Sequence, residues 1–399
     1  MKSVRDIFKT GIGPSSSHTM GPSFIAKYFK EKNPDSDYFE VTLFGSLSKT
    51  GKGHGTDRAI IETLSPTKTK IIFCEDNLPL KHPNTMELKC FENGVLKDTL
   101  TALSIGGGDI EFEGKPKEMQ NDIYKEKTFS EIADYCKSNN IRLSDYVFMH
   151  ESEDFKDFLR EIWNTMTLSI REGLTKTGTL PGGLSVERKA QYLFNQRHID
   201  ESPQTKENRI VCSYAFAVSE QNADCGIIVT APTCGSCGVV PSVLKYFQEK
   251  NGFSDDEIIK ALAVAGLIGN IVRTNASISG AECGCQAEIG TACSMAAAAL
   301  AELTEMGIDQ IEYAAEISLE HHLGLTCDPV CGLVQIPCIE RNAVAAMRAI
   351  NSLSLANFLS GSRKISFDLV VKTMYQTGKD ISHLYRETSE GGLAKLYKQ

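Results

Sequence analysis

The chain has 399 residues, of which 41% are hydrophobic and 23% are charged, so it can bury a substantial core and lacks the composition of a disordered protein. Its 42 Lys and Arg residues against 51 Asp and Glu give a net charge of −9. This balance argues against a nucleic-acid-binding protein, which needs a basic surface to neutralise phosphates. The best apolar run, residues 261–271, is shorter than the roughly 18 residues of a membrane span. Charges also occupy the N-terminus where a signal peptide has its apolar region, so we expect a cytoplasmic protein with no membrane partner.

The first part of the chain predicts an α+β domain. The dipeptide Asn93-Gly94 lies between two β-rich runs and is a strong signal for a hairpin turn. Strands are predicted at 38–47, 70–75, 86–91 and 95–103, and helices at 21–31 and 56–64.

From about residue 154 the pattern is almost entirely helical. Helices are predicted at 155–172, 254–271, 292–305, 311–322 and 343–354. The segment 292–305 is rich in alanine, which favours helix and allows close packing. We place a Lys- and Glu-rich connection at 115–127 and divide the chain into an α/β domain (1–127), a linker (128–153) and an all-helical domain (154–399).

Two loops carry residues suited to chemistry. The loop 11–19 contains Ser15, Ser16, Ser17, His18 and Thr19 just before a predicted helix. Hydroxyls and backbone N–H groups at a helix N-terminus can bind a carboxylate or phosphate, although an ordinary capping loop would look the same.

The second loop, 51–58, places His54 between two glycines. Glycine neighbours provide little packing, so we expect His54 to have an exposed and flexible backbone that can approach a ligand. Histidine is the natural proton-transfer group near neutral pH. A histidine in a surface turn is the alternative.

The 13 cysteines are unevenly distributed, with ten between Cys212 and Cys338. An odd number in a chain without export signals argues against a disulfide framework. Several lie in Gly- or Pro-flanked breaks between helices, where thiols can converge on zinc, Cu(I) or an iron–sulfur cluster. Plain burial in the core remains the alternative for any one of them, and it is our interpretation of Cys293. The Cys234-x-x-Cys237 spacing could also be a redox pair, but no tryptophan or βαβ pattern accompanies it.

Taken together, these segments resemble the iron–sulfur-dependent L-serine dehydratases. The resemblance runs through nearly the whole chain, in the family's order. It rests on the segments 13–19, 51–58, 104–108, 180–184, 231–233, 275–280, 285–286, 323–329 and 334–342. It implies a smaller N-terminal α/β domain, a mostly α-helical catalytic domain and an active site where they meet.

The resemblance also assigns roles to residues. It implies that Cys285, Cys327 and Cys338 hold a [4Fe–4S] cluster with one iron left open as a Lewis acid. It makes His54 the base that removes the α-proton of L-serine and His18 a second histidine that binds or orients substrate. No pyridoxal phosphate is expected, because the reaction needs no Schiff-base lysine. The candidates for binding the polar groups of the amino acid are Ser15, Ser16, Ser17, Thr19, Asn275, Ser277 and Ser279.

This sequence departs from the family pattern at four extra cysteines, Cys234, Cys237, Cys283 and Cys331. It also ends in Leu396-Tyr397-Lys398-Gln399, where many relatives end in a cysteine that reaches the open iron. We therefore expect water or an extra thiol at that iron in the resting enzyme.

Other functions stay open at this stage. They are a lyase for threonine or cysteine, a cluster-binding or redox sensor, and a structural zinc protein. The expected partners are a small-molecule substrate and, as in several relatives, a second copy of the chain in a homodimer.

Overall fold

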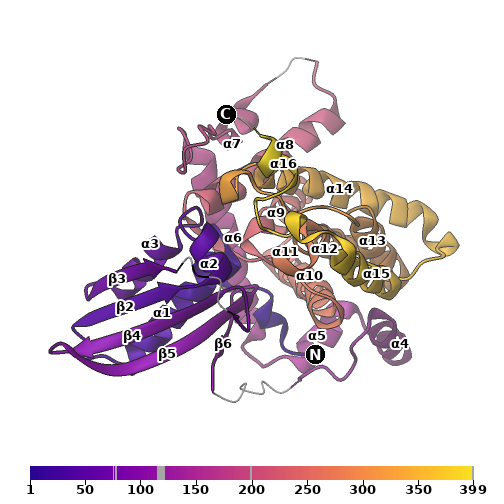
Figure 1. Ribbon diagram of the computed structural model, residues 1–399. Helices are drawn as coiled ribbons and strands as arrows, with labels where there is room; N and C mark the ends of the chain where they lie inside the picture. Colours follow the sequence, from indigo (N-terminus) through magenta and orange to yellow (C-terminus); the bar gives the residue numbers. More distant parts are fainter. Residues whose placement is uncertain (75, 77–78, 115–121, 198–199, 398–399) are drawn as a thin grey trace.

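The computed structural model describes residues 1–74, 76, 79–114, 122–197 and 200–397. It has a small β-sheet region followed by a mostly helical region, which confirms the predicted fold class (Figure 1). The sheet has the order β3-β2-β4-β5-β6, in which β2 and β3 are parallel and the other pairs are antiparallel. Its strands are β2 (Tyr38–Leu43), β3 (Lys68–Phe73), β4 (Thr85–Glu92), β5 (Val95–Gly106) and β6 (Asp109–Phe112).

One face of this sheet is covered by helices α1 (Gly21–Lys32) and α3 (Thr56–Leu64). Strand β2 shows why, because Phe39, Val41 and Leu43 alternate with less buried residues and point into this small core. Between β4 and β5, Asn93 and Gly94 have φ values of 52° and 77°, the positive values that a tight hairpin turn of this kind requires. The predicted hairpin is confirmed.

The helical region packs around α12 (Thr291–Leu303), in which every residue is buried. Its alanines let neighbouring helices approach closely, and α12 contacts α9, α10, α13 and α14. The other helices of the region are α4 (Phe129–Asn139), α5 (Leu143–His150), α6 (Phe155–Thr175), α7 (Ala190–Asn195), α8 (Pro203–Ala223), α9 (Val239–Asn251), α10 (Asp255–Asn275), α11 (Gly280–Cys283), α13 (Ile308–Glu320), α14 (Cys338–Leu359), α15 (Phe367–Asp380) and α16 (Gly392–Leu396).

The start of the chain belongs with the helical region in space (Figure 1). Val4, Ile7 and Phe8 are buried in the helical core, and strand β1 (Thr10–Ile12) pairs antiparallel with β7 (Ile227–Val229). The expected linker 128–153 likewise contains α4 and α5, whose apolar side chains lie in the same core. The packing therefore differs from the predicted division, because burial of apolar side chains joins both segments to the helices.

Some element boundaries also differ from prediction. The expected strand 38–47 ends at Leu43, because Gly45 takes a positive φ of 55° and begins the short helix α2 (Gly45–Thr50). The expected strand 70–75 is β3, and its predicted last residue lies outside the described residues, as do 115–121 of the predicted connection and the last two residues of the chain.

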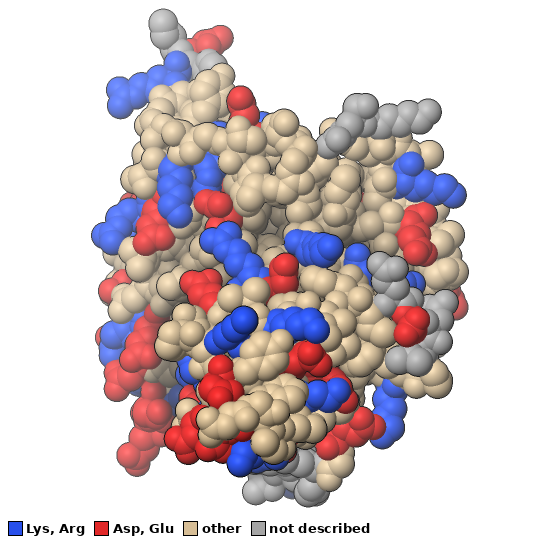
Figure 2. Space-filling view, turned by 60° about the vertical axis from the view of Figure 1, so that its left-hand side comes forward, with Lys and Arg blue, Asp and Glu red and all other residues tan. Residues whose placement is uncertain are grey.

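Charged side chains of both signs are interspersed on the face shown in Figure 2. Ion pairs form on and beside the sheet, such as Lys32 Nζ in α1 to Asp98 Oδ2 in β5 at 2.6 Å, and Lys89 Nζ to Glu87 Oε1 within β4 at 2.8 Å. Within the described residues, none of the helices combines the length and the apolar character that a membrane span requires.

Candidate active site

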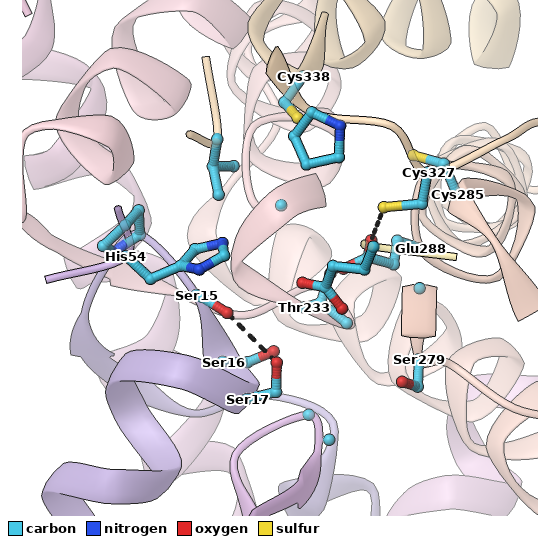
Figure 3. Close-up of a pocket in the computed structure, with 18 residues that line it drawn as sticks. Ser15, Ser16, Ser17, His54, Thr233, Ser279, Cys285, Glu288, Cys327 and Cys338 are labelled. Atoms are coloured by element: carbon cyan, nitrogen blue, oxygen red, sulfur yellow. Dashed lines mark hydrogen bonds between the residues drawn. The ribbon is translucent and has the colours of Figure 1, made fainter. Parts of the chain in front are cut away.

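A cavity lies where the two regions meet, and both regions contribute to its wall (Figure 3). The N-terminal region supplies loops, whereas the helical region supplies three thiols and two carboxylates. The lining residues are Pro14, Ser15, Ser16, Ser17, His54, Gly106, Gly107, Thr233, Gly235, Ser279, Gly280, Cys285, Glu288, Cys327, Pro329, Val334, Cys338 and Glu387.

The serine loop is anchored to the helical region by the pairing of β1 with β7. Immediately after β1, the Gly13 N–H donates to the Gly226 carbonyl at 3.1 Å, and Asn222 Nδ2 donates to the Pro14 carbonyl at 3.0 Å. The following turn, η2 (Ser16–Met20), is a π-helical turn that leads into α1, and Ser15 caps it by accepting from the His18 N–H at 3.1 Å. The loop thus presents its hydroxyls to the cavity at a helix N-terminus, as the sequence predicts.

His54 lies in the cavity wall with its ring pointing inward (Figure 3). Its side chain is buried, with a relative exposure of 1%, so the expectation of an exposed loop histidine is wrong. The His18 and His54 rings lie 4.5 Å apart between their centres, so each covers one side of the other. Thr19 Oγ1 donates to the His54 carbonyl at 2.9 Å and holds the two loops together.

The hydrogen bonds of His54 define its tautomer. Nδ1 lies 3.1 Å from the Thr50 carbonyl oxygen, which can only accept, so Nδ1 carries the proton in the neutral ring. Nε2 then has a free lone pair, and it is buried without a hydrogen-bond partner. Burial lowers the pKa of His54 to about 4, so the ring is neutral at physiological pH and Nε2 can accept a proton.

His18 lies behind His54 and does not line the cavity. Its Nδ1 is 2.9 Å from Ser17 Oγ and its Nε2 is 2.9 Å from Ser46 Oγ. Burial, followed by the charges of His54 and His82, holds the pKa of His18 well below its usual range. A neutral His18 fixed between two hydroxyls is suited to orienting His54.

The three predicted cluster cysteines come from three different segments and line the same cavity. Cys285 follows Gly284 and precedes the π-helical turn η4 (Gln286–Gly290), and Cys338 begins α14. Cys327 is fixed by the C-terminal segment, because its N–H donates to the Tyr385 carbonyl and its carbonyl accepts from the Glu387 N–H, both at 2.8 Å.

The electrostatics around these thiols favour one thiolate. The pKa of Cys285 is lowered, mainly by a hydrogen bond from Cys327. The nearby Arg341 guanidinium lowers this pKa further, whereas burial acts in the opposite direction. The same hydrogen bond and burial raise the pKa of Cys327, and burial raises that of Cys338. Within the described residues, no three His, Cys, Asp or Glu side chains converge closely enough to hold a single metal ion.

Two carboxylates in the cavity wall were missed by sequence reasoning. Glu288 accepts from Thr233 Oγ1 at 2.7 Å, and the Cys327 thiol lies 3.9 Å from its Oε2. Its position three residues after Cys285 in a turn between helices was a usable signal. Glu387 has no comparable local signal, because only the folding of the C-terminal segment against Cys327 brings it to the cavity.

The remaining predicted binding residues divide into two groups. Ser15, Ser16, Ser17 and Ser279 line the cavity. Asn275 is not among the lining residues, since its Nδ2 donates to the Lys127 and Ile271 carbonyls at 2.7 and 2.9 Å. Ser277 donates to Glu282 and lines a different cavity beside α10. Thr19 donates a hydrogen bond to the backbone carbonyl of His54.

The four extra cysteines are also outside the cavity lining. Cys234 and Cys237 are buried in a small apolar cluster with Met20, Ile170 and Tyr214. Cys283 is buried against Gly378 in α15, and Cys331 is exposed. None of these thiols is positioned beside the three cavity cysteines as a further lining group.

The cavity is small, with a free volume of about 30 Å³. A neighbouring cavity of about 1120 Å³ shares Glu387 with it and is bordered by α2 and by the segment 386–390. Glu387 therefore lies in the wall of both cavities.

Comparison with known proteins gives a consistent result. Residues 78–394 match the protein family described as serine dehydratase alpha chain, and residues 3–70 match serine dehydratase beta chain. The chain is 39% identical to L-serine dehydratase 1 of Escherichia coli K12, with 99% of each chain covered. It is 41% identical to L-serine dehydratase of Haemophilus influenzae, again with 99% of each covered. L-Serine dehydratase of Streptomyces coelicolor is 39% identical over 98% of both chains.

Proposed function

Because this chain belongs to the serine dehydratase family, with its alpha and beta chains fused, we propose that it is an L-serine ammonia-lyase. The reaction removes the α-proton and the β-hydroxyl of L-serine as water and leaves aminoacrylate. Aminoacrylate tautomerises to an imine, which water hydrolyses to pyruvate and ammonia. The observation that carries the proposal is the buried, neutral His54, whose unpartnered Nε2 belongs to the same cavity as three thiols.

His54 is the proposed general base. Its Nε2 takes the α-proton, while the Nδ1–H bond to the Thr50 carbonyl keeps the ring oriented and stabilises the charge that develops on it. His18 is a positioning residue that packs against the ring and stays neutral. Thr19 supports the same geometry through the His54 carbonyl.

Cys285, Cys327 and Cys338 are the proposed ligands of a [4Fe–4S] cluster. The donor set fits, because a cluster takes one thiolate per iron and these thiols lie around one cavity instead of converging on one point. When bound, the cluster supplies a Lewis acid that makes the substrate hydroxyl a better leaving group. The proposal needs no pyridoxal phosphate.

The hydroxyls of Ser15, Ser16, Ser17 and Ser279 are the proposed groups that bind the polar ends of the amino acid. Ser15 and Ser17 are already oriented toward each other, with 3.3 Å between their oxygens. Ser15, Ser16 and Ser17 are buried, so the hydrogen bonds that they would form with the substrate are stronger than in water. All 13 cysteines of the sequence are free in the structure, which fits the reducing cytoplasm as the proposed compartment.

The test is release of pyruvate from L-serine by protein purified without oxygen, together with its iron content and visible absorption. Pyruvate together with about four irons per chain supports the proposal. L-Threonine and L-cysteine are assayed in parallel. If either is turned over faster than L-serine, that amino acid becomes the assigned substrate. A loaded cluster without turnover of any of the three would favour a sensor.

A further inference from the structure

The charged groups in the cavity wall are of one sign. Among the described lining residues, Glu288 and Glu387 are the only Asp, Glu, Lys or Arg side chains, and both are acidic. No Lys or Arg side chain lines the cavity there, and His54 is neutral. The proposed reaction does not use either carboxylate, so their function is unassigned.

Glu288 occupies a position built to hold it. Thr233 Oγ1 donates to Oε1 at 2.7 Å, and Figure 3 shows the carboxylate directed into the cavity between Thr233 and the cysteines. Two glycines leave the necessary space, because a Cβ on Gly280 would lie 2.6 Å from Oε2 and a Cβ on Gly235 would lie 3.3 Å from Oε1. The carboxylate thus accepts one hydrogen bond from Thr233 and a longer one, at 3.9 Å, from the Cys327 thiol, and it has further lone pairs available for a ligand.

Glu387 enters the cavity from the C-terminal segment. Its backbone takes a φ of 58°, an uncommon conformation for a residue with a side chain, and its N–H donates to the Cys327 carbonyl at 2.8 Å. It lines both the closed cavity and the wider one beside it. Glu288 and Glu387 thus line the same small cavity, one from the turn that follows Cys285 and the other from the C-terminal segment.

Two adjacent carboxylates in a partly desolvated wall are stabilised by a cation between them. L-Serine carries such a cation, its α-ammonium group, which needs hydrogen-bond acceptors when it leaves water. We propose that Glu288 and Glu387 bind the α-ammonium group of the substrate, with Glu288 as the fixed acceptor and Glu387 as the residue that first meets the ligand. This inference rests on the proposed function, and it makes the cavity selective for α-amino acids over the corresponding acids without an amino group.

The ammonium group is tested with ligands that cannot react. L-Alanine and propionate differ only in the amino group, and neither has a β-hydroxyl to lose. Their binding to the iron-loaded protein is measured by calorimetry for the wild type and for Glu288→Gln and Glu387→Gln. Glutamine keeps the size of the side chain and, at position 288, an oxygen for Thr233, but it removes the charge.

We expect the wild type to bind L-alanine at least about 100-fold more tightly than propionate, since a missing N–H leaves buried acceptors unpaired. Glu288→Gln should lower the affinity for L-alanine at least about tenfold and change the affinity for propionate less than about threefold. Glu387→Gln should change both affinities in the same direction. Glu316→Gln is the matched control, because it removes a buried carboxyl from α13, away from the cavity lining. Iron content and melting temperature verify that each variant is folded and loaded.

Equal affinity of the wild type for the two ligands, including undetectable binding of both while L-serine is turned over, would overturn the inference. An equal loss of affinity for L-alanine and propionate in the Glu288→Gln and Glu387→Gln proteins would also overturn the inference, since the carboxylates would then have a structural role. The proposed function fails separately. If L-serine yields no pyruvate but the preference for L-alanine depends on Glu288, the ammonium site stands and the reaction assignment falls.

Discussion

Replacement of His54 by glutamine tests the proposed base most directly. Loss of a positioned general base costs about 10²–10⁴-fold in rate, or about 3–5 kcal/mol in the activation barrier. We therefore expect kcat for pyruvate release from L-serine to fall by at least about 100-fold in His54→Gln. His321→Gln serves as the control, because His321 lies at the end of α13 and outside the cavity lining.

The pH dependence gives a second, quantitative check on the same residue. A base of pKa about 4 is almost fully deprotonated at pH 6, whereas a histidine of ordinary pKa, about 6.5, is only about one quarter deprotonated there. Protonation removes the lone pair of Nε2, so activity is lost as pH falls through the pKa. Wild-type kcat/KM should consequently change little between pH 8 and pH 6, while an ordinary histidine would produce a drop of about fourfold.

Both measurements use protein with verified iron content, so that loss of the proposed cluster is not mistaken for loss of the proposed base. The reasoning is refuted if His54→Gln retains more than about a tenth of the wild-type kcat. It is also refuted if kcat/KM of the wild type follows an ordinary histidine between pH 8 and pH 6, since the buried ring would then be as easily protonated as an exposed one.

Three further sets of substitutions test the site and the core. Replacement of Cys285, Cys327 or Cys338 by serine should lower the amount of iron bound per chain. Cys237→Ser is the control, because Cys237 lies in a separate apolar cluster, and it should leave the iron content and the visible spectrum unchanged. Equal iron in all four proteins would contradict the assignment of the cluster ligands. In Gly280→Ala the new methyl group would lie 2.6 Å from Glu288 Oε2 and 3.2 Å from Cys327 Sγ, so KM for L-serine should rise and the free energy of unfolding should fall by about 1–3 kcal/mol; a KM equal to that of the wild type would show that this space is not needed. Ala298→Leu enlarges a fully buried side chain in α12 and should destabilise the protein by about 1–3 kcal/mol in denaturant titrations, whereas an unchanged midpoint would contradict the close packing of the alanine helix.

The local features of the fold followed from the sequence because short-range chemistry determines them. The Asn93-Gly94 turn requires positive φ values that few other residue pairs supply, and the alanine-rich segment is a helix in any setting that buries it. Boundaries were less predictable. Strand β2 ends at Leu43 because Gly45 turns the chain, which the continuing apolar pattern of the sequence concealed.

The division into regions depended on long-range packing that no local pattern reveals. The first residues of the chain contribute Val4 and Ile7 to the helical core, although more than 100 residues separate them from the first helix of that core. Likewise, helices α4 and α5 occupy what the sequence indicated as a linker. In both cases apolar side chains are buried wherever a complementary surface exists, irrespective of distance along the chain.

By itself, the sequence determined the candidate chemistry, because thiols, hydroxyls and histidines in Gly-rich loops are recognisable by type and spacing. Only the tertiary structure decided which of them share a cavity. It brings Ser15 and Cys338 to one wall and leaves Asn275 at a helix end outside it. It also buried His54 against His18, and it added Glu288 and Glu387, whose proposed function depends on their sharing one cavity. Protonation state and the proximity of acidic groups are properties of an environment, and an environment exists only once distant segments have packed together.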